Sequence, residues 1–591
     1  MIIPMKKYSF LVYHQEYKPF LVDIQNIGVL DVIKKNIDLD ENSQNKLNLI
    51  NELTKAIKFL KLRQSEAVAS DEKIDGFELF NSITEKQKEL EELNTQIEII
   101  NKEIEYVEPW GDFSLETIEN LKKENFYVRF FIAEERKFSE EWAEKYNLLE
   151  INKHKSNLYF IIIAKDNNEI EIEADEIQMP ERPISEVLKN KQEIEYKIQE
   201  INSQLNEYSN KFIPTLTETL NNLKKDFEFD NVLLNTTREA DNKLMVLQGW
   251  VAVTNEEDLK NYLDEKGIIY FAEEPKKDEK APILLKNNKF SSLFEPIGKL
   301  FSMPSYQELD LTPYFAPFFM LFFGFCLGDT GYGIVLLIVA SLLKLKFKNK
   351  KDIKPLLSLV QFLGIGTIIM GAVSGTFFGV SLGKVEAIGK MKDIFLSNDQ
   401  LLNFSMALGG VQIIFGIALR AINKIKQQGF IFAIPEFGWI LMLFSILDLA
   451  LIKYMVPVSK IILYISLGMI VFFSNPKGNF FAAIGKGIWD LYGITGIFGD
   501  VLSYIRLFAL GVSSSILGFV INSMALQAKG IPYIGYGVFV LFLILGHTGN
   551  ILLSSLGSFV HPMRLTFVEF YKNAGFEGGG KEYKPFSNKL K

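Results

Sequence analysis

The chain contains the stretch Gly499-Asp500-Val501-Leu502-Ser503-Tyr504-Ile505-Arg506-Leu507-Phe508-Ala509-Leu510-Gly511, which places an arginine within a long apolar segment. A guanidinium stays charged at physiological pH, and at bilayer depth it costs between ~3 and ~15 kcal/mol. Asp500 is six positions away on a different helix face, so it is a poor ion-pair partner. The nearest basic residues, Lys486 and Lys529, are both about twenty positions away, which disfavours the alternative that Arg506 snorkels to an interface. We therefore interpret Arg506 as a functional charge that a partner chain or an aqueous cavity must compensate.

The composition divides the chain into a soluble half and a membrane half. Hydrophobic residues make up 48% of the 591 residues, but they dominate only beyond Pro313, whereas the part before Pro296 is rich in Lys, Glu, Asn and Ile. The net charge of −8 gives no indication of nucleic-acid binding. The single cysteine, Cys326, excludes a disulfide within the chain and fits a reducing compartment. Residues 1–15 contain no run typical of a signal peptide, so we expect residues 1–296 to form a cytosolic domain.

Two helical patterns in the soluble half predict a coiled coil. Between residues 42 and 107, apolar residues such as Leu93 and Ile97 recur at spacings of three and four, and a second pattern of this kind covers residues 187–227. Two long helices separated by a small domain can pair only by folding back, which favours an antiparallel coiled coil. The alternative is two ordinary amphipathic helices within one globule. Pro214 should kink or interrupt the second helix.

Segments with the pattern of strands flank the two long helices. They are residues 6–33 (a strand followed by a helix), 126–133, 158–164, 170–174, 244–253 and 268–272. Short helices are expected at residues 139–146 and 255–266. We therefore predict a small α/β globule at each end of the coil, so that the soluble half forms an elongated α/β arm.

The membrane half, residues 297–591, predicts an α-helical membrane domain of eight transmembrane helices. The apolar segments are 313–327, 331–343, 356–380, 402–422, 438–452, 458–473, 488–528 and 534–570. Residues 313–345 are too many for one average span and few for two. The loop 344–354 is the most basic, and positive charge favours the cytoplasmic side of a membrane. An even number of crossings then precedes this loop, which predicts a helix break at residues 328–331 and places both termini in the cytoplasm.

The last two apolar segments are unusually long and polar. At a rise of 1.5 Å per residue, roughly 40 helical residues extend about 60 Å, about twice the hydrocarbon thickness. These segments should lean steeply in the membrane, project beyond it or be broken by their glycines. Both carry several serines, which can serve helix packing alone. The second segment also contains another arginine, Arg564, and two arginines are more than packing requires.

Catalytic and metal-binding signatures are absent from the sequence. Residues 478–487 end in Gly-Lys-Gly, but their spacing is not that of a phosphate-binding loop, and no Ser or Thr follows the lysine to hold magnesium. The histidines, His14, His154, His547 and His561, are not grouped as a metal site. We therefore expect no cofactor, no metal and no ATP hydrolysis by this chain, and the last two histidines fit proton handling or packing.

Several motifs together resemble one family, subunit a of V-type ATPases, which is called subunit I in bacteria and archaea. The motifs are Met1 to Lys7, Leu247 to Val251, Pro304 to Glu308, Phe322 to Gly324, Gly328 to Gly333, Ser503 to Leu510, His561 to Phe570, and Gly578 to Gly580 with Pro585-Phe586. They occur in this order over essentially the whole chain. Many members carry membrane glutamates near the two arginines, and the nearest acidic residues here are Glu436, Asp448, Asp490, Asp500 and Glu569.

The resemblance implies a stator subunit whose last two helices, bearing Arg506 and Arg564, face a rotating ring of proteolipid subunits in the lipid bilayer. A rotor carboxylate is neutral when it is protonated or sodium-loaded, and it becomes costly in hydrocarbon once it releases its ion. Arg506, helped by Arg564, would pair with the emptied carboxylate and block leakage between two half-channels. The expected half-channel lining comprises Ser503, Tyr504, Ser514, Asn522, His547, Ser554, His561 and Glu569. The cytosolic arm would dock the peripheral stalks, while subunits of the ATPase head hydrolyse ATP.

Two other classes of function stay open at this point. A secondary ion transporter or channel with a cytosolic regulatory arm would carry internal repeats and paired broken helices, and no repeat is visible. A purely structural membrane anchor would need no charge at bilayer depth. The coupling ion, H⁺ or Na⁺, is not decided by this chain, because its binding site belongs to the rotor. The family implies a multi-pass protein of a prokaryotic plasma membrane.

Overall fold

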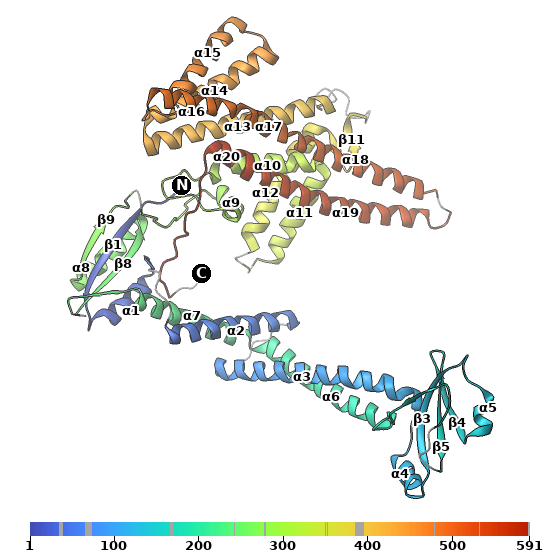
Figure 1. Cartoon of the computed structure of the whole chain (residues 1–591). Coiled ribbons are helices and arrows are strands. Elements are labelled where there is room, and N and C mark those ends of the chain that lie inside the picture. The colour runs from blue at the N-terminus through green and yellow to red at the C-terminus, as the bar shows by residue number, and fades with distance from the viewer. Residues whose placement is uncertain are drawn as a thin grey trace. The chain divides into compact units, whose positions relative to one another are not determined.

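The computed structural model describes the chain apart from residues 35–39, 66–73, 166–169, 242, 277–278, 349, 351–352, 385–394, 478, 531 and 589–591. The chain forms two compact units, one built from Met1–Ile33 with Thr237–Ser587 and the other mainly from Lys34–Thr236 (Figure 1). Residue 296, the predicted domain boundary, lies within the first unit. Chain segments on the two sides of this boundary are connected, because Ile283 forms a β-bridge with Glu582 near the C-terminus.

The first unit contains a five-stranded antiparallel sheet in the order β2-β8-β1-β9, with β7 paired to β8. Its elements are β1 (Met5–Tyr13), α1 (Tyr17–Ile27), β2 (Leu30–Val32), β7 (Thr237–Glu239), β8 (Leu244–Ala252), α8 (Glu256–Lys266) and β9 (Ile269–Glu273). Along β1, the side chains of Tyr8, Phe10 and Val12 alternate onto the buried face, as expected for a half-buried strand. The strands predicted at residues 244–253 and 268–272 are confirmed.

Glu256 connects helix α8 to this sheet. Its carboxylate accepts hydrogen bonds from the Tyr8 hydroxyl at 2.9 Å and from the ammonium groups of Lys6 and Lys260 at 2.8 Å each. Burial opposes the charge on Glu256, but the hydrogen bonds from the two lysines and the tyrosine outweigh burial and lower the pKa of this carboxyl to about 2. The ionised glutamate therefore contributes to the packing of α8 on the sheet.

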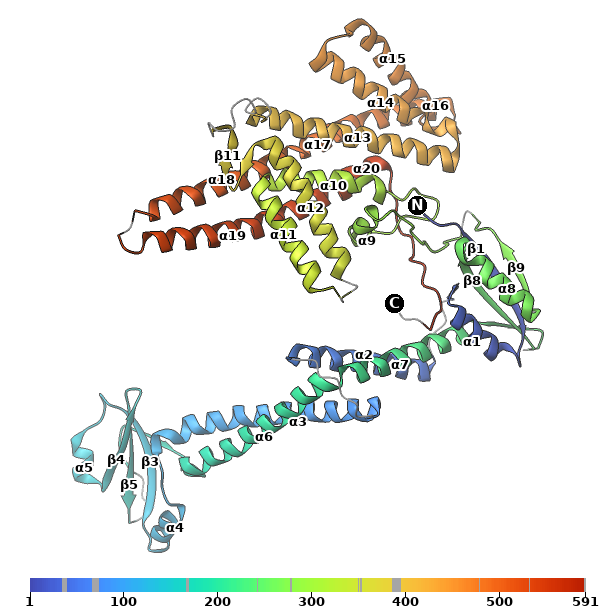
Figure 2. The ribbon, with the colours of Figure 1, turned by 180° about the vertical axis from the view of Figure 1, so that it is seen from behind.

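The second unit is a helical arm with antiparallel pairing (Figure 2). Its helices are α2 (Glu41–Arg63), α3 (Gly76–Val107), α6 (Ile184–Lys211) and α7 (Ile213–Leu234). Helix α3 packs on α6, and α2 packs on α7. The direction is antiparallel, because the start of α6 lies beside the end of α3, where Arg182 is ion-paired with Glu103 at 2.8 Å. Leu205 and Leu216 are fully buried in the shared core, which confirms an antiparallel coil.

The predicted continuous helix over residues 42–107 is wrong, because those residues form two helices, α2 and α3. The two helices pack mainly on different partners, so one straight helix could not bury both apolar stripes. The interruption predicted at Pro214 is confirmed, since α6 ends at Lys211 and α7 begins at Ile213 with the proline in its first turn.

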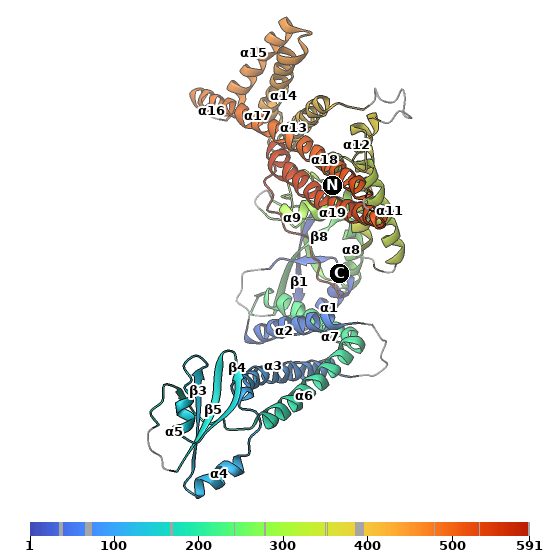
Figure 3. The same cartoon turned by 90° about the vertical axis from the view of Figure 1, so that its right-hand side faces the viewer.

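A four-stranded antiparallel sheet in the order β4-β5-β3-β6 completes the second unit (Figure 3). Its elements are α4 (Leu115–Lys123), β3 (Tyr127–Glu134), α5 (Glu140–Lys145), β4 (Leu148–His154), β5 (Asn157–Ala164) and β6 (Asp175–Ile177). Phe131 and Phe160 stack in its core at 5.7 Å. The strand predicted at residues 170–174 is wrong, because the paired strand β6 follows this segment. Strand β4 was missed because its middle residues are exposed and lack the alternation of a half-buried strand.

The rest of the first unit is a bundle of apolar helices. They are α10 (Thr312–Leu327), α11 (Thr330–Lys346), α12 (Ile353–Ser374), α13 (Asn398–Gln428), α14 (Ile434–Leu447), α15 (Val456–Phe473), α16 (Phe480–Tyr492), α17 (Ile494–Ser503), α18 (Ile505–Ala528), α19 (Gly535–Arg564) and α20 (Tyr571–Ala574), with a hairpin of β10 (Thr376–Phe377) and β11 (Val380–Ser381) after α12. Within the described residues, six helical stretches are long and apolar enough to cross a membrane. Helices α10 and α11, with 16 and 17 residues, are shorter, so length alone supports six spans rather than the predicted eight.

The helix break predicted at residues 328–331 is confirmed. Helix α10 ends at Leu327, Gly328 adopts the left-handed conformation with φ of 60°, and α11 begins at Thr330. Both helices pack against α12. Helices α10 and α11 are therefore two separate short helices joined by a tight turn, rather than one long helix.

The long segments near the C-terminus are also broken. The first is divided at Gly493 and again at Tyr504 into α16, α17 and α18, and the second changes from α19 to a π-helical segment, Leu565–Phe570, before α20. Of the breaks in the first segment, one is at a glycine, as predicted, and one is at a tyrosine. Helices α18 and α19 lie side by side (Figures 1 and 2).

Candidate functional site

Arg506 is the second residue of α18, directly after the helix break at Tyr504. Its Nη1 atom is buried and makes no hydrogen bond, and within the described residues no carboxylate oxygen lies within 4.0 Å of its guanidinium. Asp500 instead pairs with the Lys572 ammonium at 3.1 Å and accepts a hydrogen bond from the Asn573 amide at 2.8 Å. The expectation that Asp500 is a poor partner for Arg506 is therefore confirmed.

A small charged cluster surrounds Arg506. Arg564 is the last residue of α19 and is exposed, and His561 lies one turn before it. Glu569 belongs to the π-helical segment that follows, and it lies within electrostatic reach of both arginines and beside Ser503. The Glu569 side chain is buried, and its Oε2 atom has no hydrogen-bond partner. Because π-helical turns often occur at functional sites, this geometry marks the cluster as the candidate site.

The other acidic residues near the arginines in sequence have different partners. Glu436 pairs with Arg420 at 2.5 Å and with Lys424 at 2.8 Å. Asp448 accepts a hydrogen bond from the Ser459 hydroxyl at 2.6 Å. Glu569, by contrast, lies within electrostatic reach of both arginines.

Asp329 holds the turn between α10 and α11 against the hairpin after α12. Its side chain is fully buried, and its Oδ1 atom accepts the backbone N–H groups of Gly331 at 2.8 Å, Tyr332 at 3.2 Å and Phe378 at 2.8 Å. Its Oδ2 atom accepts the N–H of Gly379 at 2.7 Å. Asp329 is thus both the N-cap of α11 and the anchor of the hairpin. The hairpin in turn packs closely on α18, where a side chain on Gly379 would collide with the backbone of Gly518.

A chain of hydrogen bonds connects α11, α18 and α19. Asn522 donates through Nδ2 to a backbone carbonyl of the hairpin at 2.6 Å, so its Oδ1 atom accepts from His547 Nε2 at 3.0 Å. His547 Nδ1 then accepts from the Tyr332 hydroxyl at 2.8 Å, and this hydroxyl accepts from Asn550 at 2.8 Å. The Ser554 hydroxyl donates to the Asn550 side chain at 2.8 Å. These bonds fix a neutral His547 and hold the three helices in register.

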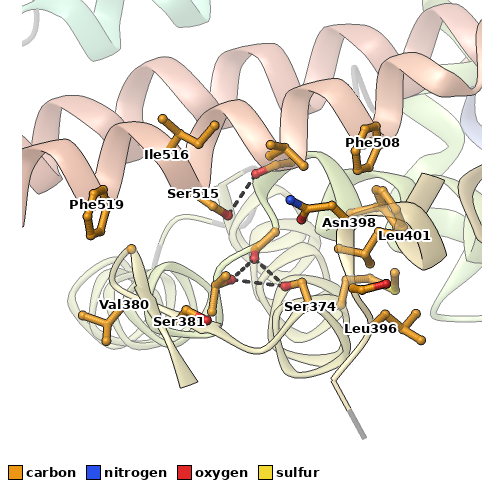
Figure 4. A pocket seen from close by; sticks show the side chains of 18 of the residues that line it. Ser374, Val380, Ser381, Leu396, Asn398, Leu401, Phe508, Ser515, Ile516 and Phe519 are labelled. Carbon is orange, nitrogen blue, oxygen red and sulfur yellow. Dashed lines mark hydrogen bonds between the residues drawn. The ribbon is translucent and has the colours of Figure 1, made fainter. Parts of the chain in front are cut away.

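A cavity of about 770 Å³ lies between α18, the hairpin, the end of α12 and the start of α13 (Figure 4). Its polar lining consists of Ser374, Thr376, Ser381, Ser397, Asn398, Ser515, Asn522 and Ser523. No ionisable side chain is among its lining residues in the described structure. The side chains of Ser374, Asn398 and Ser515 face the same space in Figure 4. Along α18 the lining begins at Phe508, two residues after Arg506, and includes no residue of the charged cluster.

The residues proposed from the sequence as half-channel lining have different positions in the structure. Asn522 lines the cavity, whereas His547 and Ser554 belong to the hydrogen-bonded chain. Ser514 is buried, and its hydroxyl has no partner. Tyr504 is fully buried and donates a hydrogen bond to Gln412 at 2.7 Å.

Sequence reasoning missed Tyr332 and Gln412 as contributors to the polar interior, whereas Asn550 is one of the polar residues noticeable in the last apolar segment. Tyr332 and Asn550 are 218 positions apart in the chain, so their contact has no local signal. A polar side chain inside an apolar segment is the one sequence feature that could have suggested them. Within the described residues, no group of three or more His, Cys, Asp or Glu side chains could hold a metal ion.

The paired helices α18 and α19 also expose an extensive apolar surface. Its residues include Ile516, Leu517, Val520, Leu541, Leu545, Leu552, Leu553, Leu556 and Val560. A surface of this kind is covered by lipid or by a partner protein in a membrane. It lies on the same two helices that carry Arg506 and Arg564.

Comparisons with known proteins connect this architecture to one family. Residues 153–380 match the V-type ATPase 116kDa subunit family. The chain is 27% identical to V-type ATP synthase subunit I of Borreliella burgdorferi over 100% of both chains. It is 30% identical to A-type ATP synthase subunit I of Methanocaldococcus jannaschii over 58% of this chain and 54% of that one.

A solved structure titled as the cytoplasmic N-terminal domain of subunit I, homolog of subunit a, of V-ATPase is also similar, with 12% identity and a TM-score of 0.19 over 45% of this chain and 99% of that one. The full-length relatives and the apolar helices that are long enough to span a membrane agree with the sequence motifs. The chain is therefore a multi-pass membrane protein that belongs to the subunit I family of V-type and A-type ATP synthases.

Proposed function

We propose that this chain is the membrane stator of a rotary V-type ATP synthase complex, in which it couples rotation of a proteolipid ring to translocation of H⁺ or Na⁺. In this role it hydrolyses no ATP itself, because other subunits of the ATPase head supply that reaction. The arm formed by residues 34–236 would dock the peripheral stalks and resist the torque of the rotor. Both termini would lie in the cytoplasm of a prokaryotic cell, with α10 and α11 crossing the membrane as two short spans of eight.

The observation that carries this proposal is the unpaired guanidinium of Arg506. A charge at membrane depth costs between ~3 and ~15 kcal/mol unless it is compensated, and no carboxylate of the described chain lies within ion-pair distance. A carboxylate on a partner that moves past α18 and α19 would supply the compensation. The exposed apolar surface beside Arg506 supports such a partner, because a ring of apolar helices could pack there.

The cavity near Phe508 suits one of the two half-channels. Its hydroxyl and amide side chains can hold water without binding an ion tightly, and its lining on α18 begins two residues after Arg506. His561 and Glu569 lie within electrostatic reach of Arg506, and with Ser503 beside Glu569 they suit the second access path. Arg506 between two such paths would release the ion from an arriving rotor carboxylate and stop direct leakage.

Ion transport by reconstituted complexes tests the proposal. Arg506→Ala should assemble with the proteolipid ring and the ATPase head, yet abolish ATP-driven ion uptake into vesicles. Arg506→Lys should also fail or nearly fail, because an ammonium lacks the planar fork and can lose its proton when it is desolvated. Arg564→Ala should be damaging but milder, since one arginine would still hold the charge barrier.

Lys529→Gln is a matched control, because it removes an exposed cation just beyond the end of the same helix. It should transport ions like the wild type. Wild-type uptake by assembled Arg506→Ala complexes would refute the proposed mechanism, and purification without a proteolipid ring or an ATPase head would refute the stator role itself.

A further inference from the structure

A second cavity, of about 460 Å³, lies among the ends of several membrane helices. It is formed by the end of α13, the start of α14, the end of α15, α16, the start of α17, and α20. Its basic lining residues are Arg420, Lys424, Lys486 and Lys572, and its acidic ones are Glu436 and Asp490. Cations therefore outnumber anions on its walls.

The pairing of these charges leaves positive charge available in the cavity. Arg420 and Lys424 share the single carboxylate of Glu436, whose side chain is almost fully buried. Lys486 is exposed on α16, and within the described residues it makes no ion pair within 4.0 Å. Lys572 is paired with Asp500 at 3.1 Å, and Asp490 lies one turn from Lys486 on α16, so the excess of positive charge comes from the two cations that share Glu436. This excess favours an anion.

This charge distinguishes the second cavity from the proposed ion path. A passage for H⁺ or Na⁺ would be blocked by four cationic side chains, whereas the cavity near Phe508 carries none. Hydrogen-bond donors from the Gln428 and Asn475 side chains also line the second cavity, and a phosphate group can accept several such bonds. The walls thus match an oxyanion of phosphate type.

The apolar surroundings favour a phospholipid as the source of that phosphate. The cavity wall combines its cations with the aromatic rings of Phe432, Trp439 and Phe473. On α16, which supplies Lys486, the side chains of Phe481 and Trp489 are among the most exposed apolar groups of the chain, at 85% and 76%. A basic pocket between helix ends beside an apolar surface can hold a lipid headgroup while the acyl chains lie along the helices.

We propose that this cavity binds the phosphate group of an anionic phospholipid, with Lys486 as its principal cationic contact. The site is separate from Arg506 and does not depend on the proposed ion transport. A bound lipid would fill the space between α13, α14 and α16 and thereby hold these helices together. Free inorganic phosphate shares the same chemistry, and the experiment separates the two sources.

Tryptophan fluorescence provides a direct test with the full chain. Trp439 lines the cavity, while Trp489 is exposed to lipid and would be quenched by any brominated lipid, so the test uses Trp489→Phe. The remaining tryptophans, Trp110, Trp142 and Trp250, lie outside the apolar helices. The protein is placed in phosphatidylcholine nanodiscs that contain phosphatidylglycerol brominated near the head of its acyl chains, or phosphatidylcholine brominated at the same positions.

We expect brominated phosphatidylglycerol to quench Trp439 more strongly than brominated phosphatidylcholine at equal mole fraction. Lys486→Gln should weaken this preference about five-fold, as expected for one lysine beside an anionic headgroup. Lys426→Gln is the matched control and should leave the preference unchanged, because Lys426 lies on α13 near the same helix ends but does not line the cavity.

Two results would overturn the proposal. Equal quenching by the two brominated lipids, with no effect of Lys486→Gln, would mean that the cavity does not select an anionic headgroup. A change in Trp439 fluorescence on adding inorganic phosphate, lost in Lys486→Gln, together with equal quenching by the two brominated lipids, would mean that the site takes free phosphate rather than lipid.

Discussion

Replacing the buried carboxylate of Asp329 should destabilise the membrane domain strongly. Asp329 accepts four backbone N–H groups from two segments that are about fifty residues apart in the chain. A hydrogen bond to a charged group contributes about 1.5–3 kcal/mol. Asp329→Ala removes all four bonds, so its cost of at least about 6 kcal/mol approaches the whole stability of a typical domain.

Asp329→Asn is the more informative variant, because it keeps the shape of the side chain. One amide oxygen can still accept from Gly331, Tyr332 and Phe378, but the amide NH₂ then faces the N–H of Gly379, which also donates. The loss of one bond, together with weaker bonds from an uncharged acceptor, gives an expected destabilisation of about 3 kcal/mol. For a domain of this size, that corresponds to a fall in Tm of about 5–10 °C.

The single cysteine allows the thermal unfolding of the Asp329 variants to be followed by thiol labelling. Cys326 is buried, so a thiol-reactive fluorescent dye should label the detergent-solubilised protein only when the helices around it unfold. Asp448→Asn is a suitable control, because Asp448 accepts a short hydrogen bond from Ser459 but is only half-buried. We expect it to lower the Tm much less than Asp329→Asn. Equal Tm values for Asp329→Asn and the wild type would refute the view that an ionised Asp329 holds the hairpin.

Three further predictions concern other parts of the chain. Leu205→Ala should destabilise the isolated fragment of residues 34–236 by about 2–5 kcal/mol in urea unfolding followed by circular dichroism, because Leu205 is fully buried, and an unchanged midpoint would refute the assigned core. Since the folded pKa of Glu256 is about 2 instead of its usual 4.5, the wild type should be more stable than Glu256→Gln above pH 4.5, and this advantage should disappear as the pH falls toward 2. Thermal unfolding across this pH range measures the difference, and a constant difference would count against the ionised glutamate. Ser381→Cys in a Cys326→Ala background should react with an impermeant maleimide from the non-cytoplasmic side, because Ser381 is exposed on the hairpin, and labelling from the cytoplasm would invert the proposed topology.

The buried carboxylate also changes how membrane topology can be tested. The predicted helix break at residues 328–331 follows one membrane crossing, so the eight-span topology places Asp329 near the non-cytoplasmic face. The structure buries its side chain completely, so a cysteine at residue 329 would be unreactive whichever side it faced. The exposed hairpin is the better reporter, since it is attached to the same turn.

Features that depend on local chemistry were predictable from the sequence. The interruption at Pro214 follows from its missing N–H, and the break after Leu327 follows from a glycine that can adopt a positive φ. The expectation that Asp500 does not pair with Arg506 was also correct, but its premise of one continuous helix was not, because a break at Tyr504 separates the two residues and Asp500 pairs with Lys572.

Features that depend on contacts between distant residues were decided by the tertiary structure. No local pattern indicates that Asp329 anchors a hairpin about fifty residues later, or that His547 is held between Asn522 and Tyr332. The approach of Glu569 to within electrostatic reach of both arginines depends in the same way on how α18 packs against the end of α19. Helical periodicity and the cost of a membrane charge act along the chain and are visible in the sequence, whereas buried polar partners are selected only when packing brings their donors and acceptors together.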